Sequence, residues 1–225
     1  MINFMNVNFM EKNCNIVNSG QFNMDYDLKM LDFAIENKIN YAMVRFYQWY
    51  PRCVSLGRNQ KETENDFSGV DVVRRQSGGR ALLHDRELTY CFVSKIFKPS
   101  IIESYKDISD GLILGFKKLG IELSYAKNKS ENVSYCMNIS SGADVSYKGK
   151  KFIGSAQFRK EGYLMQHGSI PYELDYEFIE KIFKEKIEKD KIITLNEINP
   201  DLSTRQIIEA LKEGFLEKFS LINIF

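Results

Sequence analysis

The sequence predicts an α+β fold in which helices flank a mixed or antiparallel β-sheet. Two observations support this class: strand-like patterns occupy the middle of the chain, and helical patterns lie on either side of them. The chain has 225 residues, of which 44% are hydrophobic and 27% charged, values typical of a globular protein with a full core. We therefore expect a single domain over residues 1–225.

The first expected helix covers residues 22–37. Apolar residues recur there at helical spacing, and the expected buried face consists of Met24, Leu28, Leu31 and Ile35. Strand-like patterns then run from residue 41 to residue 94. Turns interrupt them where glycine and polar residues gather, at residues 57–65 and 77–79.

A second helix is expected over residues 102–119, and Gly120 ends it. More strands follow. A hairpin has its tip at residues 148–150 and its second arm at residues 151–158, and another strand covers residues 163–170.

Two helices are expected to close the chain, at about residues 172–225. The last one begins with a capping box, in which the side chains of Ser203 and Gln206 each satisfy the backbone amide of the other. Its buried face is expected to contain Ile207, Leu211, Phe215 and Phe219.

The composition excludes several classes of protein. The net charge of +1 gives no global field that would attract nucleic acid. No apolar run approaches the length of a membrane span, and the polar N-terminus does not resemble a secretory signal. The four cysteines form no CxxC pair and have no metal-ligand spacing, so we expect a cytoplasmic protein with reduced thiols and no metal site.

The most unusual stretch is RRQSGGRALLHD, residues 74–85. Its two glycines allow the backbone to approach a ligand closely, and free amides there can bind a carboxylate or phosphate. Arg74, Arg75 and Arg80 add positive charge. The simpler interpretation is a Gly-Gly hairpin turn with a solvated basic rim.

Both histidines of the chain, His84 and His167, lie near glycines and polar residues. Neither has a metal-like partner four residues away, so a zinc site is not expected. His167 belongs to QHGSI, residues 166–170, which follows KFIGSAQ, residues 151–157. These two stretches are either plain neighbouring strands or the walls of a site.

Cys136 is the cysteine best placed for chemistry. Cys53 and Cys91 lie within apolar strand patterns, which are typical of inert core thiols, and Cys14 is far from any motif. Cys136 lies in a polar loop rich in Ser and Asn. A thiol of ordinary pKa needs a nearby cation to react, and the expected hairpin brings Lys151 back toward this loop.

These motifs together resemble the lipoate-protein ligase and octanoyltransferase superfamily. The resemblance covers roughly residues 20–170 in the family's order, and also includes the motifs at residues 23–27, 45–51, 55–57 and 87–90. It implies the catalytic fold shared by lipoate and biotin ligases. The Gly-Arg-Gly-Arg element of biotin ligases is absent, which disfavours that branch.

Within the superfamily the resemblance favours a cysteine octanoyltransferase of the Gram-positive type. Such enzymes have a cysteine fifteen residues before the family's lysine, and Cys136 stands fifteen residues before Lys151. The Gly-Arg-Asn-Asp sequence of ATP-dependent lipoate ligases is absent, and the expected C-terminal helices leave no room for a full accessory domain. Residues 57–60, GRNQ, are closer to the ligases and keep that alternative open.

The resemblance implies that Cys136 and Lys151 are catalytic, with Cys136 forming an octanoyl thioester. Octanoyl-acyl carrier protein is the implied donor, and the acceptor is a lysine of a lipoyl domain, such as the glycine cleavage H protein or a 2-oxoacid dehydrogenase acyltransferase subunit. No cofactor is implied. The implied substrate-binding residues are Arg75, Ser77, Gly78, Gly79, His84, Gly154, Ser155, Ala156, His167 and Gly168.

Three alternatives remain open at this level. The protein can be an ATP-dependent lipoate ligase, an amidotransferase that moves octanoate between lipoyl domains, or a non-catalytic subunit that binds lipoyl domains. The first needs ATP, and the last tolerates loss of Cys136.

Overall fold

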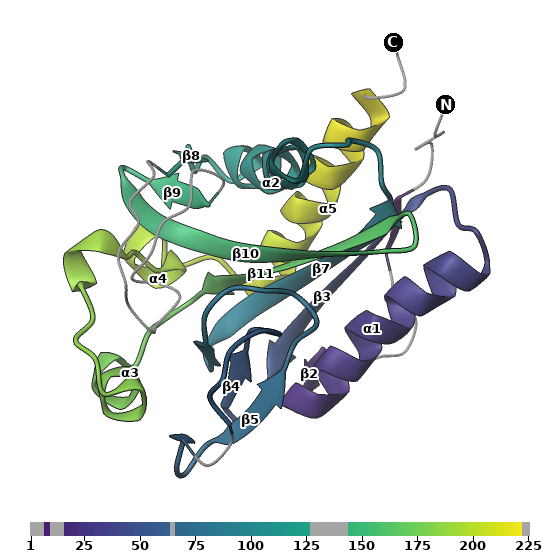
Figure 1. Ribbon diagram of the computed structural model, residues 1–225. Coiled ribbons are helices and arrows are strands. Elements are labelled where there is room, and N and C mark those ends of the chain that lie inside the picture. The colour runs from purple at the N-terminus through teal and green to yellow at the C-terminus, as the bar shows by residue number, and fades with distance from the viewer. Residues whose placement is uncertain (1–6, 10–15, 64–65, 127–143, 222–225) are drawn as a thin grey trace.

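The computed structural model describes residues 7–9, 16–63, 66–126 and 144–221 (Figure 1). Within these ranges the helices are α1 (Gly20–Glu36), α2 (Ile101–Lys118), α3 (Tyr176–Phe183), α4 (Leu195–Ile198) and α5 (Thr204–Leu221), with a 3₁₀ helix at Lys189–Lys191. The strands are β1 (Val7–Phe9), β2 (Val17–Asn18), β3 (Ala42–Trp49), β4 (Cys53–Leu56), β5 (Asp71–Arg74), β6 (Leu82–His84), β7 (Glu87–Lys95), β8 (Ser124–Tyr125), β9 (Val145–Tyr147), β10 (Lys150–Lys160) and β11 (Tyr163–Pro171).

The strands form a main sheet and a small sheet. The main sheet has the order β1-β3-β7-β11-β10-β9-β8, with β2 also paired to β3. β1 and β2 run parallel to β3, whereas the other pairs of this sheet are antiparallel. The small sheet has the order β5-β4-β6. This arrangement confirms the predicted α+β class with a mixed sheet.

The main sheet is covered on both faces, because successive side chains of a strand point to opposite sides. On one face Phe46 and Phe92 pack with Phe215 of α5, together with residues of α2. On the other face Met43 and Val93 belong to a core that also contains residues of α1. Figure 1 shows α1 on one side of the sheet and α2 with α5 on the other.

The small sheet stands on the same side of the main sheet as α1 (Figure 1). Val54 and Leu83 of this sheet pack with Ile179 and Ile182 of α3 in a third apolar cluster. The opposite side of the small sheet faces the main sheet, and the space between the two sheets holds the site described below.

Most predictions with a strong local signal are confirmed. α1 and α2 lie within two residues of their expected ranges, and Gly120 follows α2 with a positive φ of 75°. The hairpin of β9 and β10 turns at Lys148 and Gly149. The Ser203–Gln206 capping box is present, since each side chain bonds the other residue's amide, at 3.0 and 3.3 Å. All four apolar residues expected on the buried face of α5 are fully buried.

Two predictions about helices were only partly right. Leu31 of α1 is buried and Met24 and Ile35 pack against the same core, but the fully buried residues are Gly20, Asn23, Asp27, Met30, Leu31 and Ala34, so the buried face is rotated and includes two polar residues. The physical reason is that buried polar groups on β3 bind Asn23 and Asp27. The described C-terminal part also contains α3, α4 and α5 rather than two helices. α4 is a single turn closed by its own capping box and carries too short a pattern to be recognised.

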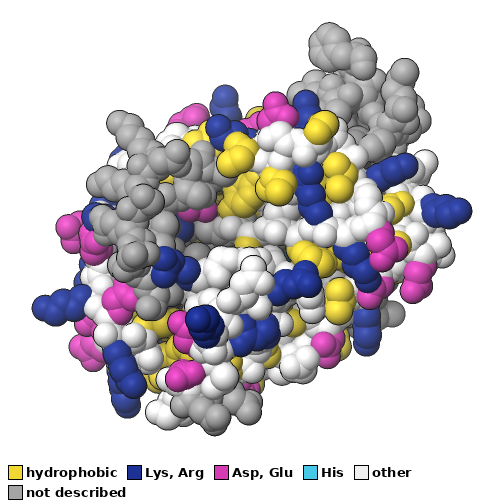
Figure 2. All heavy atoms as spheres, in the orientation of Figure 1, with side chains coloured by type: hydrophobic (Ala, Val, Ile, Leu, Met, Phe, Trp, Pro, Cys, Tyr) yellow, Lys and Arg dark blue, Asp and Glu magenta, His cyan; other side chains and the backbone are white. Residues whose placement is uncertain are grey.

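The surface in Figure 2 intersperses Lys and Arg with Asp and Glu, in agreement with the net charge of +1. None of the helices that the structure describes combines the length and the hydropathy needed to cross a membrane.

Candidate active site

A cavity lies between the main sheet and the small sheet. β3, β7, β10 and β11 form its floor, and β4, β6 and the Gly-Gly loop (residues 75–81) form the facing wall. Its lining is largely apolar and includes Met24, Tyr47, Trp49 and Leu82. A concave, apolar lining with a few polar groups is typical of a small-molecule site.

The strand register aligns the floor of this cavity. Gly154 of β10 pairs with Ser169 of β11, Ser169 with Thr89 of β7, and Thr89 with Tyr47 of β3. All four residues line the cavity. A ligand that lies across the strands therefore crosses three interstrand steps, about 14 Å in all.

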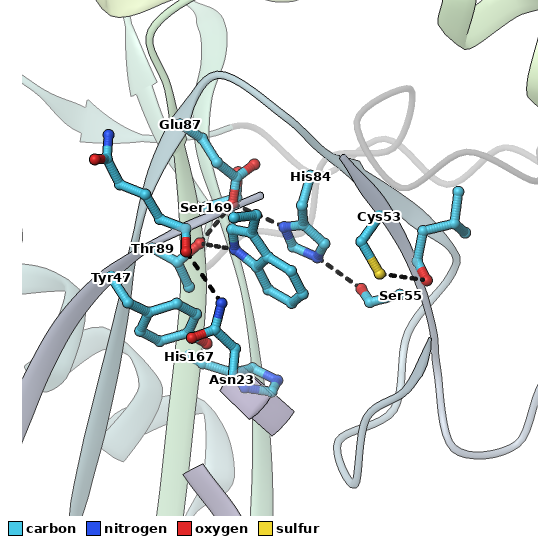
Figure 3. A network of polar contacts seen from close by, with 12 residues as sticks. Asn23, Tyr47, Cys53, Ser55, His84, Glu87, Thr89, His167 and Ser169 are labelled. Carbon is cyan, nitrogen blue, oxygen red and sulfur yellow. Dashed lines mark hydrogen bonds and ion pairs between the residues drawn. The ribbon is translucent and has the colours of Figure 1, made fainter. Parts of the chain in front are cut away.

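His84 joins the small sheet to the main sheet. Its Nε2 shares a hydrogen bond with Ser55 Oγ at 2.7 Å, and its Nδ1 contacts Glu87 Oε1 at 2.7 Å. The imidazole stacks on the Trp49 indole, with centroids 3.8 Å apart and an interplanar angle of 8°. Figure 3 shows Ser55 and Glu87 at opposite ends of the His84 imidazole.

The Glu87 carboxylate accepts hydrogen bonds from two hydroxyl groups beneath the cavity. Thr89 Oγ1 donates to Glu87 Oε1, and Ser169 Oγ donates to Glu87 Oε2, both at 2.5 Å. Trp49 Nε1 donates to Thr89 Oγ1 at 2.8 Å. The indole that lines the cavity is thus fixed by a hydrogen bond and by stacking, which gives this end a rigid shape.

His167 fixes the Gly-Gly loop to the main sheet. Ser77 Oγ lies 2.6 Å from His167 Nε2, and Asp27 Oδ2 lies 3.2 Å from His167 Nδ1. Ser77 is fully buried and is not part of the cavity lining, so this serine holds the loop.

Asp27 is the centre of a second buried polar cluster. Arg45 donates to Asp27 at 3.0 Å and to Asn23 Oδ1 at 2.6 Å, and Tyr47 donates to Asp27 at 2.7 Å. Burial, and then the neighbouring Asp27 carboxylate, raise the pKa of the Tyr47 hydroxyl well above its usual value. The phenol therefore remains a neutral donor, and these bonds explain why two polar residues of α1, Asn23 and Asp27, face the sheet.

The Gly-Gly loop is a crossover and not a hairpin turn, because β5 and β6 both pair with β4 and not with each other. The side chain of Arg75 stabilises the conformation of this loop. Its guanidinium is buried and donates to the carbonyls of Ser55, Gly78 and Arg80, at 2.7 to 2.9 Å. Gly79 has a φ of 94°, which favours glycine.

Lys151 is buried, although it stands just after the turn of the β9–β10 hairpin. Its Nζ lies 3.0 Å from Asp144 Oδ2, and both side chains are at least 94% shielded from solvent. The Tyr105 hydroxyl contacts Asp144 Oδ1 at 3.3 Å and donates to the Ser155 carbonyl at 2.7 Å. This places the ion pair beside the part of β10 that lines the cavity.

The structure brings most of the expected substrate-binding residues around one cavity. The lining includes Arg75, Gly79, His84, Gly154, Ser155, Ala156, His167 and Gly168, whereas Ser77 and Gly78 lie next to it in the loop. Cys136 and Cys14 lie outside the described residues. Cys53 and Cys91 are fully buried, as expected.

Several residues of the site were not expected from the sequence. Trp49, Ser55 and Glu87 fell within recognised motifs but were given no role, and their shared contacts with His84 become visible only in three dimensions. Asp144 belongs to none of the recognised motifs. The expected hairpin could have indicated its role, because a hairpin brings an acidic residue at the start of its first arm close to Lys151 in its second arm.

Comparisons with known proteins decide the family. Residues 19–216 match the model of the lipoyl protein ligase A/B catalytic domain. The chain belongs to this family. It is 40% identical to the octanoyltransferase LipM of Carboxydothermus hydrogenoformans, over 90% of this chain and 82% of that protein. It is 34% identical to the LipM of Staphylococcus epidermidis, over 89% and 85% respectively.

The solved structures agree on the fold. A bipartite lipoate protein ligase from Thermoplasma acidophilum, studied with its E2 lipoyl domain, superimposes with a TM-score of 0.70. The match covers 96% of this chain and 84% of that one at 20% identity, so it supports the fold of this family member and not its substrate.

Proposed function

We propose that this family member is an octanoyltransferase of lipoate biosynthesis, which moves octanoyl from acyl carrier protein to a lipoyl-domain lysine through a thioester on Cys136. The observation that carries the proposal is the set of relatives named octanoyltransferase LipM, which are up to 40% identical along most of the chain. The cysteine fifteen residues before Lys151 agrees with it.

In the proposed first half-reaction, the Cys136 thiolate attacks the carbonyl carbon of the donor thioester. The tetrahedral oxyanion collapses, the carrier leaves as a thiol after taking up a proton, and octanoyl remains bonded to sulfur. In the second half-reaction the acceptor amine attacks the new thioester. The amine loses a proton, an amide forms, and the Cys136 thiol is regenerated.

The cavity supports this substrate class. An extended octanoyl chain measures roughly 9 Å at ordinary single-bond lengths, which is shorter than the 14 Å row of floor residues. Burial of its seven carbons beyond the carbonyl contributes about 5 kcal/mol at roughly 0.8 kcal/mol per CH₂. We assign the lining residues expected from the sequence to acyl binding.

Lys151 is the proposed partner of Cys136. An ammonium near the thiol favours the thiolate, and the same group can assist proton transfer from the attacking amine. Its pairing with buried Asp144 fixes the position of Nζ beside β10. Backbone amides near Gly78, Gly79 and Gly154 are proposed to stabilise the oxyanion.

The proposed acceptors are lipoyl domains such as the glycine cleavage H protein and the acyltransferase subunits of 2-oxoacid dehydrogenases. A solved relative was studied together with its E2 lipoyl domain, which supports an acceptor of this class. We propose that the reaction takes place in the cytoplasm, without nucleic acid or membrane.

Intact-mass measurement tests this proposal. Incubation with octanoyl-carrier protein and no ATP should add one octanoyl group to the enzyme, and hydroxylamine should remove it because it is a thioester. A Cys136→Ala protein that still takes up the label, or labelling that requires ATP and free octanoate, would overturn the proposal. The ATP requirement would instead support the ligase alternative suggested by residues 57–60.

A further inference from the structure

Three hydroxyl groups belong to the floor of the cavity. They are those of Ser169, Thr89 and Tyr47, which follow Gly154 in the row that crosses the main sheet. A hydroxyl group can donate one hydrogen bond and can also accept. The polarity that a ligand meets on this floor therefore depends on the direction of the three hydrogens.

Each of these hydroxyl groups donates its hydrogen to a buried carboxylate of the protein. Ser169 and Thr89 donate to Glu87, both at 2.5 Å. Tyr47 donates to Asp27 at 2.7 Å. Neither carboxylate belongs to the cavity lining that the described residues form. Because a carboxylate only accepts, it directs the three hydrogens toward groups outside the lining and leaves only hydroxyl oxygens for a ligand.

Donors elsewhere in the lining are likewise bonded to the protein. Trp49 Nε1 donates to the threonine of the floor row at 2.8 Å. The Arg75 guanidinium donates to three backbone carbonyls and to Ser55 Oγ. The hydroxyl groups of Ser55 and Ser155 share hydrogen bonds with neighbouring side chains, at 2.7 and 2.8 Å. A ligand group that needs a donor from these side chains therefore has to break one of these bonds.

The floor row indicates where along an acyl chain this polarity acts. Neighbouring strands lie about 4.8 Å apart, so Ser169 is one step and Thr89 two steps from Gly154 on β10. Lys151, the proposed partner of the thioester, is also on β10. An extended chain advances roughly 1.25 Å per bond at ordinary bond lengths. With the carbonyl at Gly154, carbon 6 of octanoyl therefore lies between the two hydroxyl groups.

We propose that Glu87 makes the site selective for fully reduced acyl chains and against chains that carry a ketone. The inference rests on the proposed function, which places the acyl chain over this floor, and it names the class of acyl group that is transferred. A ketone oxygen only accepts, so its burial over Ser169 and Thr89 leaves it without a hydrogen bond, which is costly. Glu87 does not touch the ligand and is a positioning residue for the two hydroxyl groups.

Two acyl groups of nearly equal shape test this selectivity in the wild-type enzyme. 6-Oxooctanoyl has a ketone at carbon 6, and 6-methylideneoctanoyl has a CH₂ group in place of that oxygen. Both are supplied as carrier-protein thioesters. We expect kcat/KM to be at least about tenfold lower for the ketone, as a buried acceptor without a hydrogen bond implies. Equal kcat/KM values would overturn the proposal without any variant.

Glu87→Gln changes the hydrogen-bond donors with little change in the size of the side chain. The Thr89 hydroxyl and His84 Nδ1 both bond Oε1, so the amide oxygen should remain on that side. The amide nitrogen then faces Ser169, whose hydroxyl donates to Oε2 in the wild type. Because the amide donates to the serine oxygen, the serine hydrogen becomes free for a ketone. The wild-type ratio of the two kcat/KM values should then fall at least about fivefold.

Two further variants complete the test. Glu87→Gln/Ser169→Ala should discriminate as strongly as the wild type, because the freed hydroxyl is absent, and a double variant that keeps the reduced ratio would overturn the proposal. The matched control is Glu217→Gln, which should keep the wild-type ratio. Glu217 is an exposed residue of α5 that pairs with Lys118, on the opposite face of the main sheet.

The ratio separates this role from a structural one. If Glu87 only stabilises the fold, Glu87→Gln lowers both kcat/KM values together and leaves their ratio unchanged, which would overturn the proposal. A wild-type enzyme that uses the free acids only with ATP would overturn the proposed function instead. The same ratio, measured on the two acids, would then still decide whether Glu87 sets the selectivity.

Discussion

Two cysteines of this protein are core residues whose environment predicts their reactivity. Burial, and then the Asp71 carboxylate, raise the pKa of the Cys53 thiol to about 12. Burial also raises the pKa of Cys91, with Asp27 as the next cause. Since the thiolate is the nucleophile, both should resist iodoacetamide in the folded protein at neutral pH and react after denaturation. Peptide mass mapping checks this, and rapid labelling of Cys53 before denaturation would contradict it.

The buried Lys151–Asp144 pair allows a structural role to be separated from a chemical one. Lys151→Met leaves the Asp144 carboxylate buried without this cation, which typically costs about 3 to 5 kcal/mol of stability. The double variant Lys151→Met/Asp144→Asn should recover much of that stability, because neither member of the pair is then charged. It should still fail to transfer octanoyl. Urea unfolding and single-turnover acylation measure the two quantities, and normal transfer by the double variant would leave Lys151 a structural role only.

The Gly-Gly loop combines a backbone requirement with a place in the cavity wall. Gly79 and Gly69 both have positive φ, 94° and 78°, but only Gly79 lines the cavity. Leucine at either position should therefore cost about 1 to 2 kcal/mol of backbone strain. Gly79→Leu should in addition slow acylation per folded molecule, because its side chain enters the rim, whereas Gly69→Leu should not. Melting temperatures measure the strain, and single-turnover rates measure the effect on acylation. Equal rates for the two variants would show that Gly79 is not part of the acyl pocket.

The crossing of α2 and α5 depends on glycines at closest approach. A β-carbon on Gly214 would lie 2.3 Å from Gly111 O and from Gly115 N, both backbone atoms that cannot move aside. Gly→Ala in a helix gains about 1 kcal/mol of propensity, but overpacking costs about 1 to 3 kcal/mol or more. We expect the cost of overpacking to exceed the gain in helix propensity, so that Gly214→Ala lowers the free energy of unfolding. Lys117→Ala, at an exposed position of α2, is the control.

The elements that the sequence predicted well are those with a local signal. The capping box of α5 and the glycine after α2 act within one turn, so their residues alone reveal them. The buried face of α1 was predicted only in part, because Asp27 is buried by partners on β3, Arg45 and Tyr47, that no local pattern contains. The motif residues reached the cavity as expected, but their connections through His84 and His167 span up to 140 residues of sequence.

At the scale of the whole molecule, the cavity lies between two sheets that have separate apolar cores. The main sheet packs on α1 at this side, and the small sheet packs on α3, so a ligand that fills the cavity contacts both units at once. A ligand that binds only the folded state stabilises it by about 2.7 kcal/mol at a concentration of 100 times Kd. Ligand binding should therefore stabilise the packing of the two sheets against each other.

Hydrogen exchange with and without octanamide tests this coupling. We expect slower amide exchange in β10 and β11 on one wall and in β4, β6 and the Gly-Gly loop on the other, because the octanoyl chain contacts both. Acetamide has the same amide group without the long chain and should protect neither wall. Protection limited to the far side of the small sheet, where Phe67 and Ile182 line a separate hollow, would place the acyl chain outside the cavity between the sheets. Protection of the main sheet alone would show that the small sheet is not a wall of the acyl site.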